Sequence, residues 1–142
     1  MRSFSDPPKQ GERNSIEFSI LKGQTLCDIE KFSKDDNDSE MVRFISMTGR
    51  VFEMYHDQDC CESVMLDDVV GDLSDLIGHP LQMAEEASFV EWPEGVAPSD
   101  YEDESFLWTF YKLATINGYV TLRWYGCSNG YYSEEVSFYE VT

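Results

Sequence analysis

The C-terminal part of the chain, from Ser105 onward, constrains the fold most strongly, because turn signals divide it into short β-prone runs. Three such runs are joined by Asn117-Gly118 and by Ser128-Asn129-Gly130. Asn-Gly pairs favour tight hairpins, since both central positions of a type I′ turn need a positive φ. We therefore expect a three-stranded antiparallel meander over residues 105–141.

Two earlier segments complete the expected fold. Residues 41–55 contain two β-prone runs around a glycine turn and predict a hairpin. A short helix is expected over residues 72–77, because Asp72 can cap its start, Gly78 suits its end and Pro80 forbids its continuation. The resulting fold class is α+β, mostly antiparallel β.

The domain organisation follows from where this patterning begins. Residues 1–16 are polar and rich in proline and glycine, which predicts a flexible arm. Residues 17–142 predict a single β-rich domain, and 42% hydrophobic residues are ample for its core. Residues 88–104 predict an exposed acidic loop. The sequence has no apolar run of about 20 residues and begins without a signal-peptide pattern, which favours a cytoplasmic protein without a membrane span.

Charge narrows the choice of partner. The chain has 28 acidic and 10 basic residues, for a net charge of −18. Because binding to a nucleic-acid backbone depends on Lys and Arg, we expect no direct nucleic-acid binding and a basic partner protein instead. Residues 51–100 contain 13 acids and no Lys or Arg, so this segment is the candidate binding face. The acids selected as its binding residues are Asp67, Asp68, Asp72, Asp75, Glu85, Glu86, Glu91 and Glu94.

Two cations in the expected meander suggest a different site. If Asn117-Gly118 forms a two-residue loop, Lys112 faces Arg123 across the hairpin. Like charges placed opposite each other are unfavourable, so an acidic group is expected between them. This group is either a structural carboxylate, such as Asp59 or Glu62, or a bound anion. The alternative ligand pocket comprises His56, Glu62, Lys112, Arg123, Tyr125, Asn129 and Tyr132.

The segment 55–62 combines His, Asp, Cys and Glu, which are the side chains of zinc sites and of cysteine nucleophiles. Adjacent cysteines on a strand point to opposite faces, so Cys60 and Cys61 are not expected to share a metal ion. The neighbouring acids disfavour the thiolate that catalysis by Cys60 and His56 would need. We therefore expect reduced cysteines packed as small residues, no catalytic residue, no metal and no cofactor.

Several separate motifs resemble a family of small domains of unknown function that are encoded mainly by bacteriophages. The similarity covers about residues 23–138. Its motifs lie at residues 55–64, 71–78, 84–86, 108–112 and 123–133. The resemblance implies a viral protein that acts inside a bacterial host, and it brings no catalytic residues with it.

Charge and resemblance together predict a small acidic phage protein that inhibits or modulates a host protein that handles nucleic acid. An anti-restriction or anti-CRISPR protein of this kind, which acts against host defence, could work by DNA mimicry, because rigidly spaced carboxylates can occupy a Lys/Arg-lined groove. The alternative function is a sponge that sequesters an anionic nucleotide in the pocket around Arg123. An enzyme is the third possibility, and it depends only on His56, Cys60 and Glu62.

Overall fold

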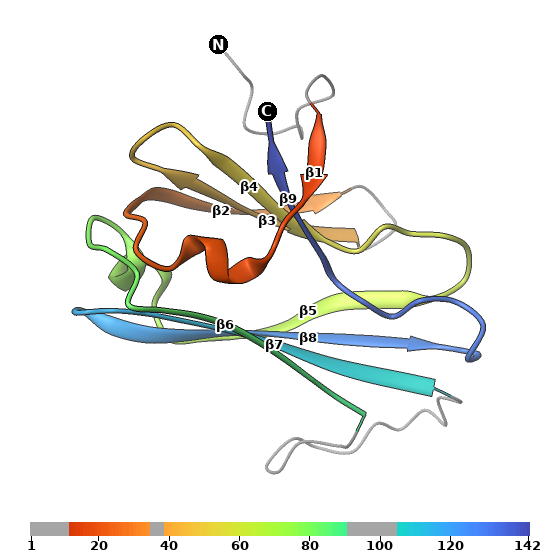
Figure 1. The fold of residues 1–142 in the computed structure, drawn as a ribbon. Coiled ribbons are helices and arrows are strands. Elements are labelled where there is room, and N and C mark those ends of the chain that lie inside the picture. The colour runs from red at the N-terminus through yellow and green to blue at the C-terminus, as the bar shows by residue number, and fades with distance from the viewer. Residues whose placement is uncertain (1–11, 35–38, 91–104) are drawn as a thin grey trace.

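The computed structural model describes residues 12–34, 39–90 and 105–142. Two antiparallel sheets pack face to face (Figure 1), one of five strands in the order β1-β9-β4-β3-β2 and one of four strands in the order β5-β8-β7-β6. The strands are β1 (Arg13–Ser15), β2 (Leu26–Lys34), β3 (Ser39–Ser46), β4 (Val51–Tyr55), β5 (Ser63–Val70), β6 (Met83–Phe89), β7 (Ser105–Thr115), β8 (Gly118–Ser128) and β9 (Ser137–Val141). Two short 3-10 helices are η1 (Phe18–Leu21) and η3 (Leu73–Leu76).

The core lies between the two sheets, because alternate side chains of each strand point inward. Phe52 and Phe138 stack on the inner face of the five-stranded sheet, with ring centroids 5.7 Å apart. Trp124 of the four-stranded sheet reaches across, and its Nε1 donates to Met54 Sδ at 3.2 Å. Phe18 of η1 lies between the layers, with its ring centroid 4.7 Å from that of Tyr111 and 5.2 Å from that of Phe138.

The α+β prediction is wrong, because the described residues contain no α-helix and the fold is nearly all β. The helix expected over residues 72–77 is the four-residue η3. Asp72 caps it as expected, since its side chain accepts the Ser74 N–H at 2.9 Å, and Gly78 has a φ of +84°. The stop signals come so soon after the cap that only one tight turn forms. No helix of the described residues is long and apolar enough to cross a membrane.

The hairpin predicted over residues 41–55 is confirmed, with β3 paired to β4. The prediction of a three-stranded meander over residues 105–141 is confirmed only for its first two strands. Strands β7 and β8 form a hairpin, but β9 joins the other sheet between β1 and β4. Two facts explain this change of sheet: β5 pairs with the free side of β8, and β9 delivers Phe138 to the core from the opposite layer.

The register of the β7–β8 hairpin differs by two residues from the prediction. Thr115 pairs with Gly118, so the loop is Ile116-Asn117 rather than Asn117-Gly118. Lys112 therefore lies opposite Thr121, while Arg123 lies opposite Phe110. A shift of two residues preserves the face of each side chain, so the two cations share the outer face of the sheet as diagonal neighbours.

The predicted arm and the predicted acidic loop are only partly within the described residues. Residues 13–15 of the arm form β1, which pairs with β9 at the edge of the five-stranded sheet. Residues 1–11 lie outside the described part of the chain, as do residues 91–104 of the loop.

A buried ion pair ties β1 to the centre of the five-stranded sheet. Glu53 of β4 is fully buried, and its Oε2 lies 3.2 Å from Arg43 Nη2. Its Oε1 accepts from Arg13 Nε at 2.9 Å. One of the 13 acids between residues 51 and 100 is therefore neutralised in the interior.

Candidate functional site

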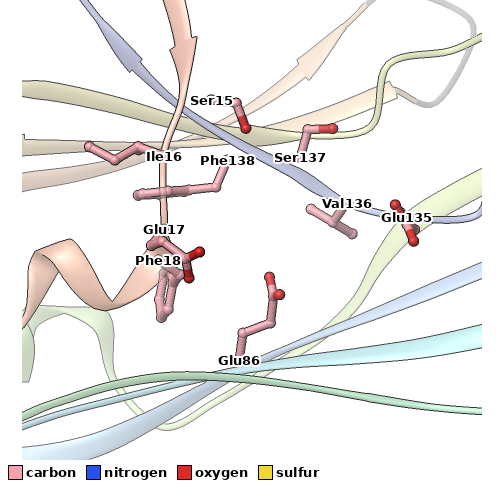
Figure 2. A pocket seen from close by; sticks show the side chains of 9 residues that line it. All are labelled: Ser15, Ile16, Glu17, Phe18, Glu86, Glu135, Val136, Ser137 and Phe138. Atoms are coloured by element: carbon pink, nitrogen blue, oxygen red, sulfur yellow. The ribbon is translucent and has the colours of Figure 1, made fainter.

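The strongest candidate site is a cavity of about 530 Å³ at the margin between the two sheets, which we call the acidic pocket. Its walls come from the start of the domain, from β6 and from the entry into β9 (Figure 2). The lining residues are Ser15, Ile16, Glu17, Phe18, Glu86, Glu135, Val136, Ser137 and Phe138. None of these nine carries a positive charge, whereas three of them are glutamates.

Strand β6 positions Glu86 in the pocket through the period-two alternation of a strand. Ala84 points into the core, so Glu86 lies on the same inner face, and Tyr111 of β7 lies directly opposite it. Burial raises the pKa of Tyr111, and a hydrogen bond between its side chain and Glu86 raises that pKa further. The phenol therefore remains protonated beside Glu86 and helps to hold its carboxylate.

The two other glutamates come from opposite ends of the sequence. Glu17 directly precedes η1, and Glu135 lies in the segment between β8 and β9. Figure 2 shows their carboxylates with Glu86 on separate walls, while the rings of Phe18 and Phe138 line the side toward the core. The pocket therefore combines negative charge at its walls with an apolar inner side.

A second ordered cluster lies in the segment between β4 and β5 and is centred on Glu62, whose side chain is fully buried. Its Oε2 accepts from the Asp59 N–H at 2.8 Å and lies 2.7 Å from His56 Nε2. Its Oε1 accepts from the Cys60 N–H at 2.8 Å and from Gln58 Nε2 at 3.2 Å. We call Glu62 and these four donor residues the Glu62 hub.

The electrostatics of the hub favour an ionised carboxylate. Burial alone raises the pKa of Glu62, but the N–H of Cys60, the His56 ring and the N–H of Asp59 all bond to the charged form. These bonds outweigh the cost of burial and lower the pKa of Glu62 to about 2. The buried acid therefore organises the loop instead of acting as a general acid near neutral pH.

His56 connects the hub to the acidic pocket. Its Nδ1 lies 2.6 Å from the backbone oxygen of Glu135, and its Nε2 bonds to Glu62. Both ring nitrogens therefore face oxygen atoms of other residues. The ring thus links the segment before β5 to the segment before β9.

The acids predicted as one binding face are separated in the structure. Asp67 and Asp68 lie on β5 and Glu85 and Glu86 lie on β6, at opposite edges of the four-stranded sheet. Asp72 caps η3, and Asp75 contacts the backbone at Gly118, where an added Cβ would lie 2.7 Å from its Oδ2. Glu91 and Glu94 lie outside the described residues. Of the six described acids, only Glu86 lines the acidic pocket.

The residues of the alternative ligand pocket fall into three places. His56 and Glu62 meet in the hub, whereas Lys112, Arg123 and Tyr125 lie on the outer face of the four-stranded sheet. Asn129 and Tyr132 lie in the segment after β8, where Asn129 Oδ1 accepts the Tyr131 N–H at 3.0 Å. None of these seven residues lines the acidic pocket.

Arg123 has carboxylate partners, as the structural interpretation of the cation pair required, but they are not the two that were expected. Its Nη2 lies 2.6 Å from Asp67 Oδ2 and 3.6 Å from Asp68 Oδ2. Asp59 and Glu62, the expected partners, belong to the hub segment instead. Lys112 lies opposite Glu85 of β6.

The cysteine expectation also needs correction. Cys60 and Cys61 lie in the segment between β4 and β5 rather than on a strand, so their side chains need not point apart, and they form a vicinal disulfide. Among the described residues, no group of three or more His, Cys, Asp and Glu side chains is arranged to hold a metal ion.

Glu17 and Glu135 were missed by sequence reasoning. Glu17 follows the predicted arm, and Glu134-Glu135 is one of many acidic pairs in a chain with 28 acids. No local signal could identify them, because they share a pocket only through the crossing of β9 into the five-stranded sheet.

Comparison with known proteins identifies the family but adds no activity. The profile of the family described as Domain of unknown function (DUF7448) matches residues 19–138. No curated protein and no solved structure matches the chain. The resemblance to an uncharacterised family is confirmed in that general form, whereas a bacteriophage origin stays a prediction. Because the match covers most of the sequence, the chain belongs to the DUF7448 family.

Proposed function

We propose that this protein is a binding module for a basic partner protein, and that the acidic pocket receives a lysine or arginine side chain of that partner. The observation that carries the proposal is the convergence of Glu17, Glu86 and Glu135 on one cavity with an apolar inner side. Lys and Arg have the matching chemistry, since each combines an apolar stem with a cationic head.

The size of the pocket suits such an occupant. Cavities that bind small molecules span roughly 300–1,000 Å³, and the acidic pocket measures about 530 Å³. A single side chain with part of its own backbone fits within that volume. Phe18 and Phe138 would contact the stem, while the three glutamates would surround the charged head.

The net charge of −18 supports the same kind of partner. A strongly negative surface steers a basic protein toward the pocket and accelerates association at low salt. A basic surface that binds nucleic acid is a suitable target, so we extend the proposal to inhibition or modulation of a host protein that handles nucleic acid. This extension and the proposed phage origin are supported by charge and by the sequence resemblance.

The structure favours single-residue anchoring over extensive DNA mimicry. Mimicry needs carboxylates at regular spacing on one surface, whereas four of the six described acids of the predicted face lie at opposite edges of a sheet and the other two lie at η3. The nucleotide-sponge alternative is less favoured for another reason. An anion at Arg123 would have to displace Asp67, which already holds the guanidinium through both Nε and Nη2.

The proposal is tested by an NMR titration with a short lysine-containing peptide and with its Nε-acetylated twin. Acetylation removes the charge and retains the stem, so only the unmodified peptide should shift the amide signals of the pocket. The pocket variant carries Glu17→Gln, Glu86→Gln and Glu135→Gln. A matched control carries Glu12→Gln, Asp59→Asn and Glu85→Gln, which remove the same charge at exposed positions outside the pocket.

We expect the pocket variant to lose at least about tenfold in affinity, equivalent to roughly 1.4 kcal/mol, and the control to lose less than about twofold. Equal losses in both variants would show that only net charge attracts the peptide. Equal binding of the acetylated peptide would contradict recognition of a cation. Either result would refute the pocket as the binding site.

A further inference from the structure

The vicinal cysteines occupy the exposed part of a segment that is otherwise tightly bonded. Cys60 and Cys61 are both exposed and joined by a disulfide, whereas Glu62, the next residue, is buried. The peptide group that links the two cysteines is part of the disulfide ring. The N–H of Cys60 donates to Glu62, and the carbonyl of Cys60 accepts from Gln58 Nε2 at 3.2 Å.

We propose that Cys60 and Cys61 form a thiol–disulfide exchange site whose redox state is transmitted to the Glu62 hub. This inference goes beyond the proposed function, and it concerns residues that the binding proposal does not use. The exchange partner is a dithiol reductant, either a small molecule or a protein with two neighbouring thiols.

The exchange reaction proceeds in two steps through a mixed disulfide. One thiolate of the reductant attacks a sulfur of the Cys60–Cys61 bond, so that a mixed disulfide forms and the other cysteine leaves as a thiolate. The second thiol of the reductant then breaks the mixed disulfide and closes its own disulfide. Two electrons and two protons pass to the protein, which ends as the dithiol, and the reverse reaction restores the disulfide.

The position of this disulfide argues against a main role in stabilising the fold. In the chain-entropy account, a disulfide stabilises a fold by closing a loop in the unfolded chain, and the effect grows with the length of that loop. A bond between adjacent residues closes the shortest loop that a chain allows. Its main effect is therefore local, on the backbone of Cys60 and Cys61.

The hydrogen bonds show how a local change would spread. Opening the ring removes the conformational constraint on the peptide group between the cysteines. The carbonyl of that peptide group accepts a hydrogen bond from Gln58 Nε2. The Cys60 N–H is one of the donors that hold Glu62, and Glu62 holds His56 Nε2. His56 Nδ1 lies 2.6 Å from the Glu135 oxygen, so this chain of bonds ends at a wall of the acidic pocket.

The test compares the full chain in dithiothreitol and in oxidised glutathione. Peptide mapping without reduction measures whether Cys60 and Cys61 are linked, and amide NMR follows the hub through Asp59 and Cys60. The amide of Val136 reports on the pocket wall, because it shares a peptide group with the Glu135 carbonyl. The test variant is Cys60→Ser with Cys61→Ser, and the matched control is Cys27→Ser with Cys127→Ser.

Under oxidising conditions we expect the peptide that contains Cys60 and Cys61 to have two hydrogens fewer than its dithiol form and to resist alkylation. Under reducing conditions we expect all of this peptide as the dithiol. The three amide signals should shift between the two states in the wild type and in the Cys27/Cys127 control, and should not shift in the Cys60/Cys61 variant. Thermal unfolding confirms that each variant is folded.

Three results would overturn the proposal. Alkylation of both cysteines at every redox ratio would show that no exchangeable bond forms. A bond from either cysteine to Cys127 or to a second molecule would show a different pairing. Amide signals of Asp59, Cys60 and Val136 that stay fixed while the disulfide opens would show that the hub does not respond. These measurements require no partner protein, so their outcome is independent of the outcome of the peptide-binding test.

Discussion

Replacing Glu62 by Gln is the most direct test of the Glu62 hub. The change keeps the shape of the side chain but turns one acceptor oxygen into an NH₂ donor. Four donors converge on the carboxylate, so at least one backbone N–H of Asp59 or Cys60 would then face another donor. A buried N–H left without an acceptor is destabilising.

The size of the effect follows from linkage between protonation and folding. The pKa of Glu62 falls from its ordinary 4.5 to about 2, which corresponds to about 3 kcal/mol of stability that only the ionised form provides. Because the folded-state pKa is lowered, this stability is fully present above about pH 5 and is lost as the pH falls toward 2. The Gln variant has no group to titrate and lacks this contribution at every pH.

The assay is urea unfolding followed by tryptophan fluorescence at pH 7, 5 and 3. Comparing wild type with Glu62→Gln at each pH cancels the titration of the other acids. We expect a difference of about 3 kcal/mol at pH 7 that shrinks steadily toward pH 2. Asp59→Asn, which changes an exposed carboxylate in the same segment, should change stability by less than about 0.5 kcal/mol. A Glu62→Gln difference below about 1 kcal/mol at pH 7, or one of constant size across the pH range, would refute this account of the hub.

Three further predictions concern the sheets and are checked by the same unfolding measurement. Glu53→Gln should lower the free energy of unfolding by roughly 3–5 kcal/mol, because it removes the charge of the carboxylate that contacts the buried Arg43 guanidinium; a change near zero would contradict this. Gly71→Ala should lower the free energy of unfolding more than Gly49→Ala does. Both glycines have a positive φ, but only at Gly71 would the new Cβ meet a backbone oxygen, at 2.5 Å. Equal losses of stability would show that the structure relaxes to relieve this close approach. Burial, with Asp57 nearby, raises the pKa of Tyr55 to about 12, so its stabilising contribution is present below pH 10 and lost between about pH 10 and 12. Tyr55→Phe should remove that part of the pH dependence, and an unchanged alkaline profile would count against it.

Sequence patterns predicted those features of the fold that depend on neighbouring residues. The β3–β4 hairpin and the cap at Asp72 were recognised because turn and capping chemistry acts over a few residues. Register was predicted less well. A loop of two residues was correct, but its placement at Ile116-Asn117 is fixed by pairing along all of β7 and β8. The helix prediction failed because stop signals so close to the cap allow only a 3-10 turn.

The error in topology and the failure to predict the acidic pocket have the same cause. If β9 had paired with β8 as predicted, Glu135 would lie on the third strand of the meander, within the same sheet as β7 and β8. Because β5 occupies that side of β8, the chain crosses to the five-stranded sheet, and Glu135 enters the margin between the layers opposite Glu86. The choice of partner for β9 depends on strands distant in sequence, so a local pattern could not reveal it. Once that pairing is known, the three glutamates become neighbours, and the candidate binding site follows from the topology rather than from any motif.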